Sequence, residues 1–152
     1  MVNYVFKLEK FLEQNCFNLR KNVAISNRDL YLVHIFGCND NHSFSVKLNE
    51  LSDKTISFYG YGLEETFQLT DKNFLRVTEL IKIAINNGVR LDVIQNSKTV
   101  FSYEFITDKP LTVESARETY KEMRIMSGKY VSPCTIVCSN FLGTSNFKIN
   151  IQ

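Results

Sequence analysis

Residues 43–88, SFSVKLNELSDKTISFYGYGLEETFQLTDKNFLRVTELIKIAINNG, decide the fold, because their hydrophobic period changes from two residues to between three and four. In Ser43–Leu51 apolar and polar residues alternate, which predicts a strand with one face in solvent. Thr55–Tyr59 and Glu65–Leu69 predict two more strands, separated by a tight turn at Gly60–Gly62. Neighbouring strands joined by short turns favour antiparallel pairing, so this part of the chain is expected to form a meander.

A helix is expected to follow the meander, beginning at Asp71. Its apolar positions recur every three or four residues, as on the buried stripe of an amphipathic helix. They are Phe74, Val77, Ile81, Ala84 and Ile85. Asn87-Gly88 is expected to end the helix, because glycine adopts the left-handed cap conformation at low cost.

The same patterns predict two further helices, one over Asn3–Leu19 and one from an N-cap at Thr112 to about Met126. Strand-like segments are found at 29–36, 89–95, 99–106, 130–138 and 146–151, and residues 23–25 form either a short strand or a connector. We therefore expect a single α+β domain over residues 1–152. It has two layers: one twisted, mainly antiparallel sheet, with three helices packed mostly on one face.

Charge and composition narrow the functional classes. The formal net charge of +2 is too small to indicate nucleic acid or an anionic membrane by itself. No segment approaches the roughly 18 apolar residues of a membrane-spanning helix, and the N-terminus does not have the pattern of a signal peptide. We expect a soluble protein in the cytoplasm of its cell or of an infected host, with no membrane partner. Frequent Asn, Lys, Ile, Phe and Tyr, whose codons are A/T-rich, suggest a phage or low-GC bacterial source.

Motifs that identify a reaction are missing from the sequence: it has no nucleophile elbow, phosphate-binding glycine loop, dinucleotide fingerprint or paired zinc histidines. One arrangement remains as a weak catalytic candidate, in which Cys38 is the nucleophile and His42 its base. The alternative is that these are ordinary structural residues. No cofactor is expected.

Four residues are weak candidates for a zinc site: Cys38 with His42, and Cys134 with Cys138. In a strand the two later cysteines would lie about 13 Å apart, too far to share one metal ion unless the chain turns between them. The alternative is that these cysteines are small buried apolar residues. Because no export signal is present, reduced thiols are expected rather than disulfides.

The third helix carries a basic stripe. Arg117, Lys121 and Arg124 follow one another at intervals of four and three residues, and Lys129 lies just beyond the helix. Like charges at this spacing are mildly destabilising. A stripe that is present despite this repulsion is a candidate site for an anion or nucleic acid. The alternative is a solvated face of an amphipathic helix, since glutamates line its other flank.

The first helix has apolar residues on two sides. Its main stripe is expected to pack on the core and consists of Val5, Leu8, Phe11, Leu12, Cys16 and Leu19. Phe6 and Phe17 project to the other side. Burying each ring is worth on the order of 2 kcal/mol, so either the helix is sandwiched within the fold or these rings contact another chain.

The sequence therefore leads to three functional hypotheses. The first is a non-enzymatic protein-binding module, such as an adaptor, an inhibitor or a chaperone-like protein, whose partner is another protein chain or a second copy in a homodimer. The order of elements is similar to that of the small, dimeric secretion chaperones of bacterial type III systems. The alternative is a nucleic-acid or nucleotide binder using the basic stripe, and the third is a small enzyme with a Cys/His site.

Overall fold

The computed structural model describes residues 3–37, 41–127 and 133–152. The elements are α1 (Tyr4–Asn15), β1 (Lys21–Ser26), β2 (Leu30–Phe36), β3 (Ser43–Asn49), β4 (Thr55–Gly60), β5 (Leu63–Gln68), α2 (Asp71–Asn87), β6 (Gly88–Gln95), β7 (Lys98–Ile106), α3 (Val113–Ser127), β8 (Cys134–Asn140) and β9 (Asn146–Ile151). Every strand pairing in this part of the chain is antiparallel. The α+β class, the antiparallel pairing and the three helices are confirmed.

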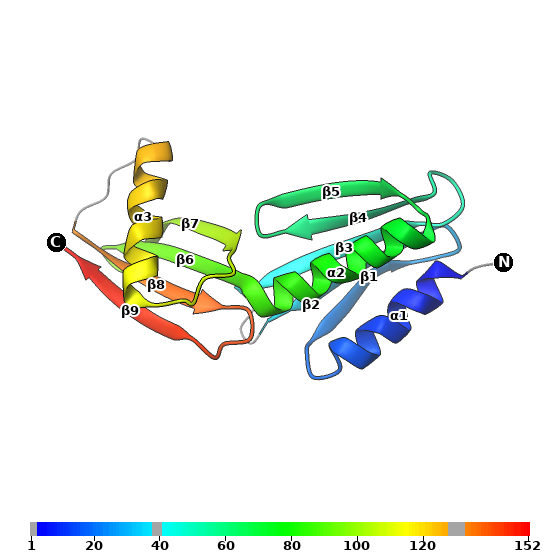
Figure 1. Cartoon of the computed structure of the whole chain (residues 1–152), viewed down its shortest axis with the longest axis horizontal. Coiled ribbons are helices and arrows are strands. Elements are labelled where there is room, and N and C mark those ends of the chain that lie inside the picture. Colours follow the sequence, from blue (N-terminus) through cyan, green and yellow to red (C-terminus); the bar gives the residue numbers. More distant parts are fainter. Residues whose placement is uncertain (1–2, 38–40, 128–132) are drawn as a thin grey trace.

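The strands form two sheets rather than the single sheet expected. One has the order β1-β2-β3-β4-β5 and the other the order β7-β6-β8-β9 (Figure 1). The division occurs at α2, whose 17 residues carry the chain roughly 25 Å along the first sheet. Because β6 begins at Gly88, immediately after Asn87, no loop is available to turn the chain back onto β5. β6 therefore pairs with β7 and β8.

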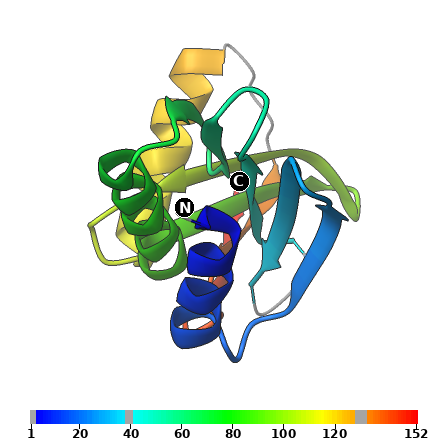
Figure 2. The same ribbon diagram turned by 90° about the vertical axis from the view of Figure 1, so that its right-hand side faces the viewer.

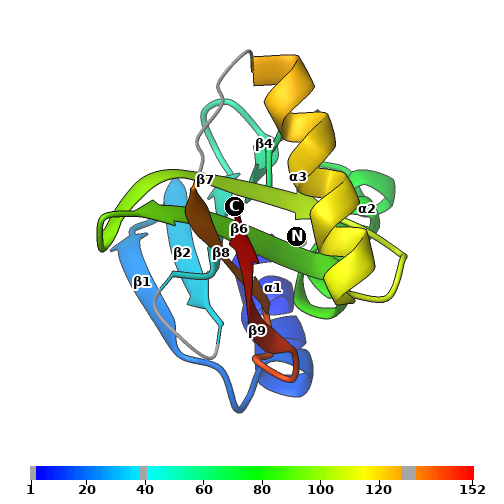
Figure 3. The ribbon, with the colours of Figure 1, turned by 90° about the vertical axis from the view of Figure 1, so that its left-hand side faces the viewer.

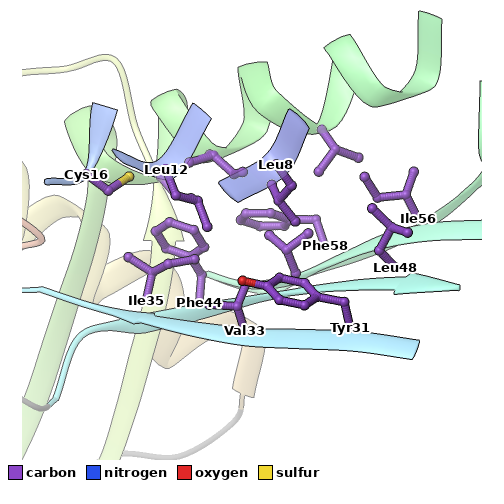
Figure 4. Packing of buried hydrophobic residues seen from close by; sticks show 14 of the residues in the cluster. Leu8, Leu12, Cys16, Tyr31, Val33, Ile35, Phe44, Leu48, Ile56 and Phe58 are labelled. Atoms are coloured by element: carbon purple, nitrogen blue, oxygen red, sulfur yellow. The ribbon is translucent and has the colours of Figure 1, made fainter. Parts of the chain in front are cut away.

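The first sheet is covered on one face by α1 and α2 (Figure 2). Alternate residues of β2 and β3 point into this core, as the period-two pattern predicts. Figure 4 shows α1 above these strands. The buried hydrophobic residues are Leu8, Leu12, Cys16, Tyr31, Val33, Ile35, Phe44, Val46, Leu48, Ile56, Phe58, Tyr61, Val77, Ile81, Ala84 and Phe141.

Helix α1 is shorter than expected, and the predicted stripe packs on the core. Its buried residues are Leu8, Leu12 and Cys16, and its partly buried ones are Val5, Phe11 and Leu19. The Asn3 side chain caps the N-terminus of the helix by accepting a hydrogen bond from the backbone N–H of Phe6. The helix ends at Asn15 rather than at Leu19, and the Lys21 ammonium group donates to the carbonyl oxygens of Cys16 and Leu19 at 2.6 and 3.2 Å. These bonds satisfy carbonyls that a continuing helix would have paired.

Gly88 ends α2 for a different reason from the one predicted. Its backbone is extended, with φ −73° and ψ 129°, and is not left-handed. A Cβ atom at this position would lie 2.5 Å from the carbonyl oxygen of Ala84 and 2.6 Å from the ring of Tyr61. Glycine is therefore required by close packing at the junction of α2 with β6.

The second sheet has its own core, on which α3 packs. Figure 3 shows α3 beside the strands, and Figures 1 and 3 together show that it crosses their direction steeply. The Thr112 hydroxyl caps this helix by accepting a hydrogen bond from the backbone N–H of Ser115, as predicted. The buried residues are Leu91, Val93, Ala116, Tyr120, Met123, Cys134, Ile136, Cys138 and Ile149. None of the helices in the described residues is long and apolar enough to cross a membrane.

Candidate functional site

The two aromatic rings set apart in the sequence both lie outside the core. The side chain of Phe6 is 55% exposed and that of Phe17, which follows the helix, is 78% exposed. The sandwiched arrangement, in which the fold itself covers these rings, is therefore not adopted. The Lys10 ammonium lies 5.0 Å from the centre of the Phe6 ring. The outward side of α1 and the turn that follows it thus present two large apolar groups with charged residues between them.

His42 lies at the boundary between the two sheets and is fully buried. Its Nδ1 atom is 2.6 Å from the hydroxyl of Tyr61, and its Nε2 atom is 2.7 Å from Oγ of Ser139 on β8. Burial lowers the pKa of His42 to about 4, the nearby Arg90 charge lowers it further, and Asp92 opposes the shift. The imidazole is therefore neutral at pH 7, so one ring nitrogen donates a hydrogen bond and the other accepts one.

The His42–Ser139 distance is that of a nucleophile and its base. The imidazole is nevertheless enclosed, and both of its nitrogens already have protein partners. Such an arrangement joins two sheets and offers no accessible base to a substrate. Cys38, the suggested nucleophile, lies outside the described residues. The partners of His42 could not be predicted, because they are 19 and 97 residues away along the chain.

A charged cluster lies beside this boundary, on the face of the second sheet away from α3. Arg90 bonds to Asp92 at 2.9 Å and to Glu104 at 2.5 Å, and it donates to the carbonyl oxygen of Asn41 at 3.0 Å. The Ser102 hydroxyl also donates to Asp92. The guanidinium thus connects β6, β7 and the segment before β3.

The residues proposed for a metal site are not brought together. Cys134 and Cys138 are buried under α3, and burial, with a smaller contribution from Asp92, raises the pKa of Cys138 to about 12. His42 bonds to Ser139, whose side chain points to the opposite face of β8 from its neighbour Cys138. Cys38 is not among the described residues, and those residues contain no group of three or more potential metal ligands.

Three of the four basic residues do share a surface. Arg117, Lys121 and Arg124 line a hollow of about 280 Å³ between α3 and β9. Tyr120, Asn150, Ile151 and Gln152 complete its lining. Lys129 lies outside the described residues. The hollow combines three cations with amide side chains, a lining that suits an anionic ligand.

A further hollow, of about 320 Å³, lies between β7 and the other side of α3, and we call it the β7 groove. Its walls are formed by Tyr103, Phe105, Ile106, Thr107, Lys109, Pro110, Leu111, Ser115, Glu118, Thr119 and Glu122. Sequence reasoning predicted the β6–β7 hairpin and α3 but missed this groove. Periodicity identifies the buried side of an element, not which of two neighbouring strands a helix leaves uncovered.

Comparison of the chain with protein-family models, curated proteins and solved structures found no match. The function must therefore be inferred from the surfaces described above.

Proposed function

We propose that this protein acts by binding protein chains through the outward side of α1, without catalysing a reaction. The supporting observation is the exposure of Phe6 on α1 and of Phe17 just after it, while Leu8 and Leu12 on the opposite side of the helix are buried. Covering each ring would contribute on the order of 2 kcal/mol, reduced by the fraction already buried. Large aromatic side chains of this kind are typical anchors of protein interfaces.

The order of residues on this side of α1 indicates a second copy as the partner. Phe6, Lys10, Glu13 and Phe17 follow one another at intervals of four, three and four residues. In an antiparallel pair of α1 helices related by a twofold axis, Phe6 would lie opposite the C-terminal end of α1 of the second copy, where Phe17 follows two residues after the helix ends at Asn15. Lys10 would face Glu13 of the second copy in the same arrangement. We call these four residues the α1 column. In this arrangement the column is complementary to itself in both its apolar and its charged positions.

The expected dimer is weak. Helix α1 has 12 residues and is roughly 18 Å long, so the contact of two such helices falls short of the about 1,200–2,000 Å² of a stable complex. We expect association that depends on concentration in the range accessible to light scattering behind size exclusion.

Substitution of both rings tests the proposal. The double variant Phe6→Asp/Phe17→Asp is expected to be a folded monomer at concentrations where the natural sequence dimerises, because aspartate cannot be buried there. Leu75→Asp on α2 is the matched control, since Leu75 is 61% exposed and lies outside the column. A natural sequence that stays monomeric at every concentration would contradict self-association through α1.

Charge reversal tests the antiparallel order separately. Lys10→Glu is expected to weaken the dimer, because it places glutamate opposite Glu13 of the second copy. The double variant Lys10→Glu/Glu13→Lys should restore it by exchanging the two charges. If the double variant is as weak as the single one, the helices do not pair in this order.

A second candidate function rests on the hollow formed by Arg117, Lys121 and Arg124. If it binds nucleic acid, the affinity for a single-stranded RNA probe should fall steeply as salt rises. Lys121→Gln should reduce that affinity and Lys72→Gln, on the distant α2, should not. Equal effects of both variants would indicate non-specific attraction to a basic surface.

A further inference from the structure

Strand β7 is an edge of the second sheet. Its outer side at Glu104 lies close to the β4–β5 turn, because a Cβ atom on Gly62 would be 3.6 Å from the Glu104 carbonyl oxygen, so the part open to pairing is Lys98–Ser102. The strand pairs with β6 alone, and its nine residues make it the longest strand in the described part of the chain. Along such an edge, alternate residues direct both N–H and C=O groups away from the sheet. These groups can be satisfied by water or by the backbone of another extended segment.

Aromatic side chains line the floor of the β7 groove beside this edge. Tyr103 is opposite Leu91 in the register of β6 and β7, so it points to the same face of the sheet as the core under α3. It remains 38% exposed and packs against Phe105, with 5.4 Å between ring centres. The floor is therefore apolar and uncovered, and aromatic rings of this kind attract cations over their faces.

The wall of the groove along α3 is acidic. Glu118 and Glu122 lie one helical turn apart on the side of α3 that faces β7, and both are exposed. Lys109 lies at the end of the groove, so the lining contains two carboxylates and one ammonium group. An aromatic floor beside two carboxylates matches a long side chain with an apolar stem and a cationic end.

The size of the groove favours an extended segment over a helix. Its volume of about 320 Å³ is at the lower end of small-ligand pockets and suits one long side chain. A helix is about 10 Å in diameter, which is wide for a hollow of this volume. A helix would also leave the edge groups of β7 unpaired.

We propose that the β7 groove binds an extended, basic peptide segment of another protein. Its backbone adds a strand to β7 along Lys98–Ser102, and an arginine or lysine side chain extends over Tyr103 and Phe105 with its charge at Glu118 and Glu122. This surface is separate from the outward side of α1, so the inference does not depend on self-association.

The test uses a labelled, end-blocked octapeptide of four Thr-Arg repeats and measures its dissociation constant by fluorescence anisotropy. The octapeptide in which citrulline replaces arginine is the matched probe, because it keeps the shape and removes the charge. The Thr-Arg peptide is expected to bind and the citrulline peptide to bind more weakly. Glu118→Gln/Glu122→Gln should weaken the Thr-Arg peptide roughly fivefold, as expected for two exposed ion pairs.

The control variant is Asp53→Asn/Glu79→Gln, which removes two exposed carboxylates from the first half of the chain and should leave the affinity unchanged. Equal losses in the two variants, equal binding of the citrulline peptide, or no binding at all would overturn the proposal. N-methylation of alternate peptide amides tests strand addition. Methylation of the alternate amides that face β7 should abolish binding, and methylation of those that face away should not. Equal effects of the two sets would exclude pairing with β7.

Discussion

At the scale of single residues, His42 shows how a side chain with several possible chemistries is assigned one role by its surroundings. In the sequence it is a candidate base or metal ligand. In the fold it is enclosed, and both ring nitrogens bond to hydroxyl groups, one from the β4–β5 turn and one from β8. Enclosure removes the hydration that a charged imidazole needs, so the residue stays neutral and connects the two sheets.

Acid is therefore expected to destabilise the protein through His42. The folded pKa of about 4 lies below the ordinary value of 6.5, so between these pH values the unfolded chain binds a proton that the folded chain does not. The contribution of His42 to the free energy of unfolding should be constant above pH 6.5, fall by up to about 3 kcal/mol between pH 6.5 and 4, and then level off.

Urea unfolding at pH 7 and pH 4.5 measures this loss. In His42→Gln the part of the loss due to His42 should disappear, so the stability gap between this variant and the natural sequence narrows at acid pH. His34→Gln is the control, because His34 is half-buried and bonds to Ser45 on the first sheet. An undiminished gap at pH 4.5 would show that the unfolding of the chain does not depend on protonation of His42.

At the scale of elements, the helix boundaries follow from local hydrogen bonding. The Thr70 hydroxyl accepts from the backbone N–H of Asn73 at 3.1 Å, and Asp71 lies in the first turn of α2, where a negative charge is favourable. Asp71 also accepts from the Tyr4 hydroxyl at 2.8 Å, which ties the start of α2 to α1. Capping and the contact between the helices thus meet at one place.

Thr70→Ala is expected to lower the free energy of unfolding by about 1 kcal/mol, because the N–H of Asn73 loses its acceptor. Thr70→Ser keeps the acceptor and should change stability much less. Thermal unfolding followed by circular dichroism compares the two variants. If both variants lose the same free energy of unfolding, the missing methyl group and not the cap causes the effect.

At the scale of the whole molecule, two cores are joined by a few buried residues. Phe141 follows β8 of the second sheet but belongs to the core of the first, where its ring is 5.4 Å from that of Phe44. Its backbone N–H donates to the carbonyl oxygen of Gly88 at 3.0 Å. With His42, these contacts connect the halves at the point where α2 passes into β6. A single domain that unfolds in one transition stays a prediction, which the next substitution tests.

Phe141→Ala is expected to lower the free energy of unfolding by about 3–5 kcal/mol, since it leaves a cavity at the junction. Leu142→Ala, at the next position and 40% exposed, should cost less than about 0.5 kcal/mol. Denaturant titration gives both values. If the Phe141 variant unfolds in two separated transitions, the halves are independent units; a single transition at lower denaturant would show that they unfold together.

How much of this molecule could be predicted differs between the fold and its surfaces. Alternation in Ser43–Leu51 and the apolar stripe after Asp71 were sufficient for the strands, the helices and the α+β class, because these patterns depend on neighbours within a few residues. The exposure of Phe6 and Phe17 was one of two predicted outcomes. To choose between exposed rings and rings buried within the fold, one has to know that no element of the described fold covers the outer side of α1.

The sequence by itself determined the elements and the buried side of each one. Tertiary structure alone decided that β6 joins β8 and not β5, that His42 meets Ser139 across 97 positions, and that α3 leaves Tyr103 uncovered beside Glu118. The physical reason is the distance along the chain between the residues that interact. Secondary structure is set by local periodicity and capping, whereas the junction and the β7 groove arise from contacts between elements far apart in the chain, which no local pattern encodes.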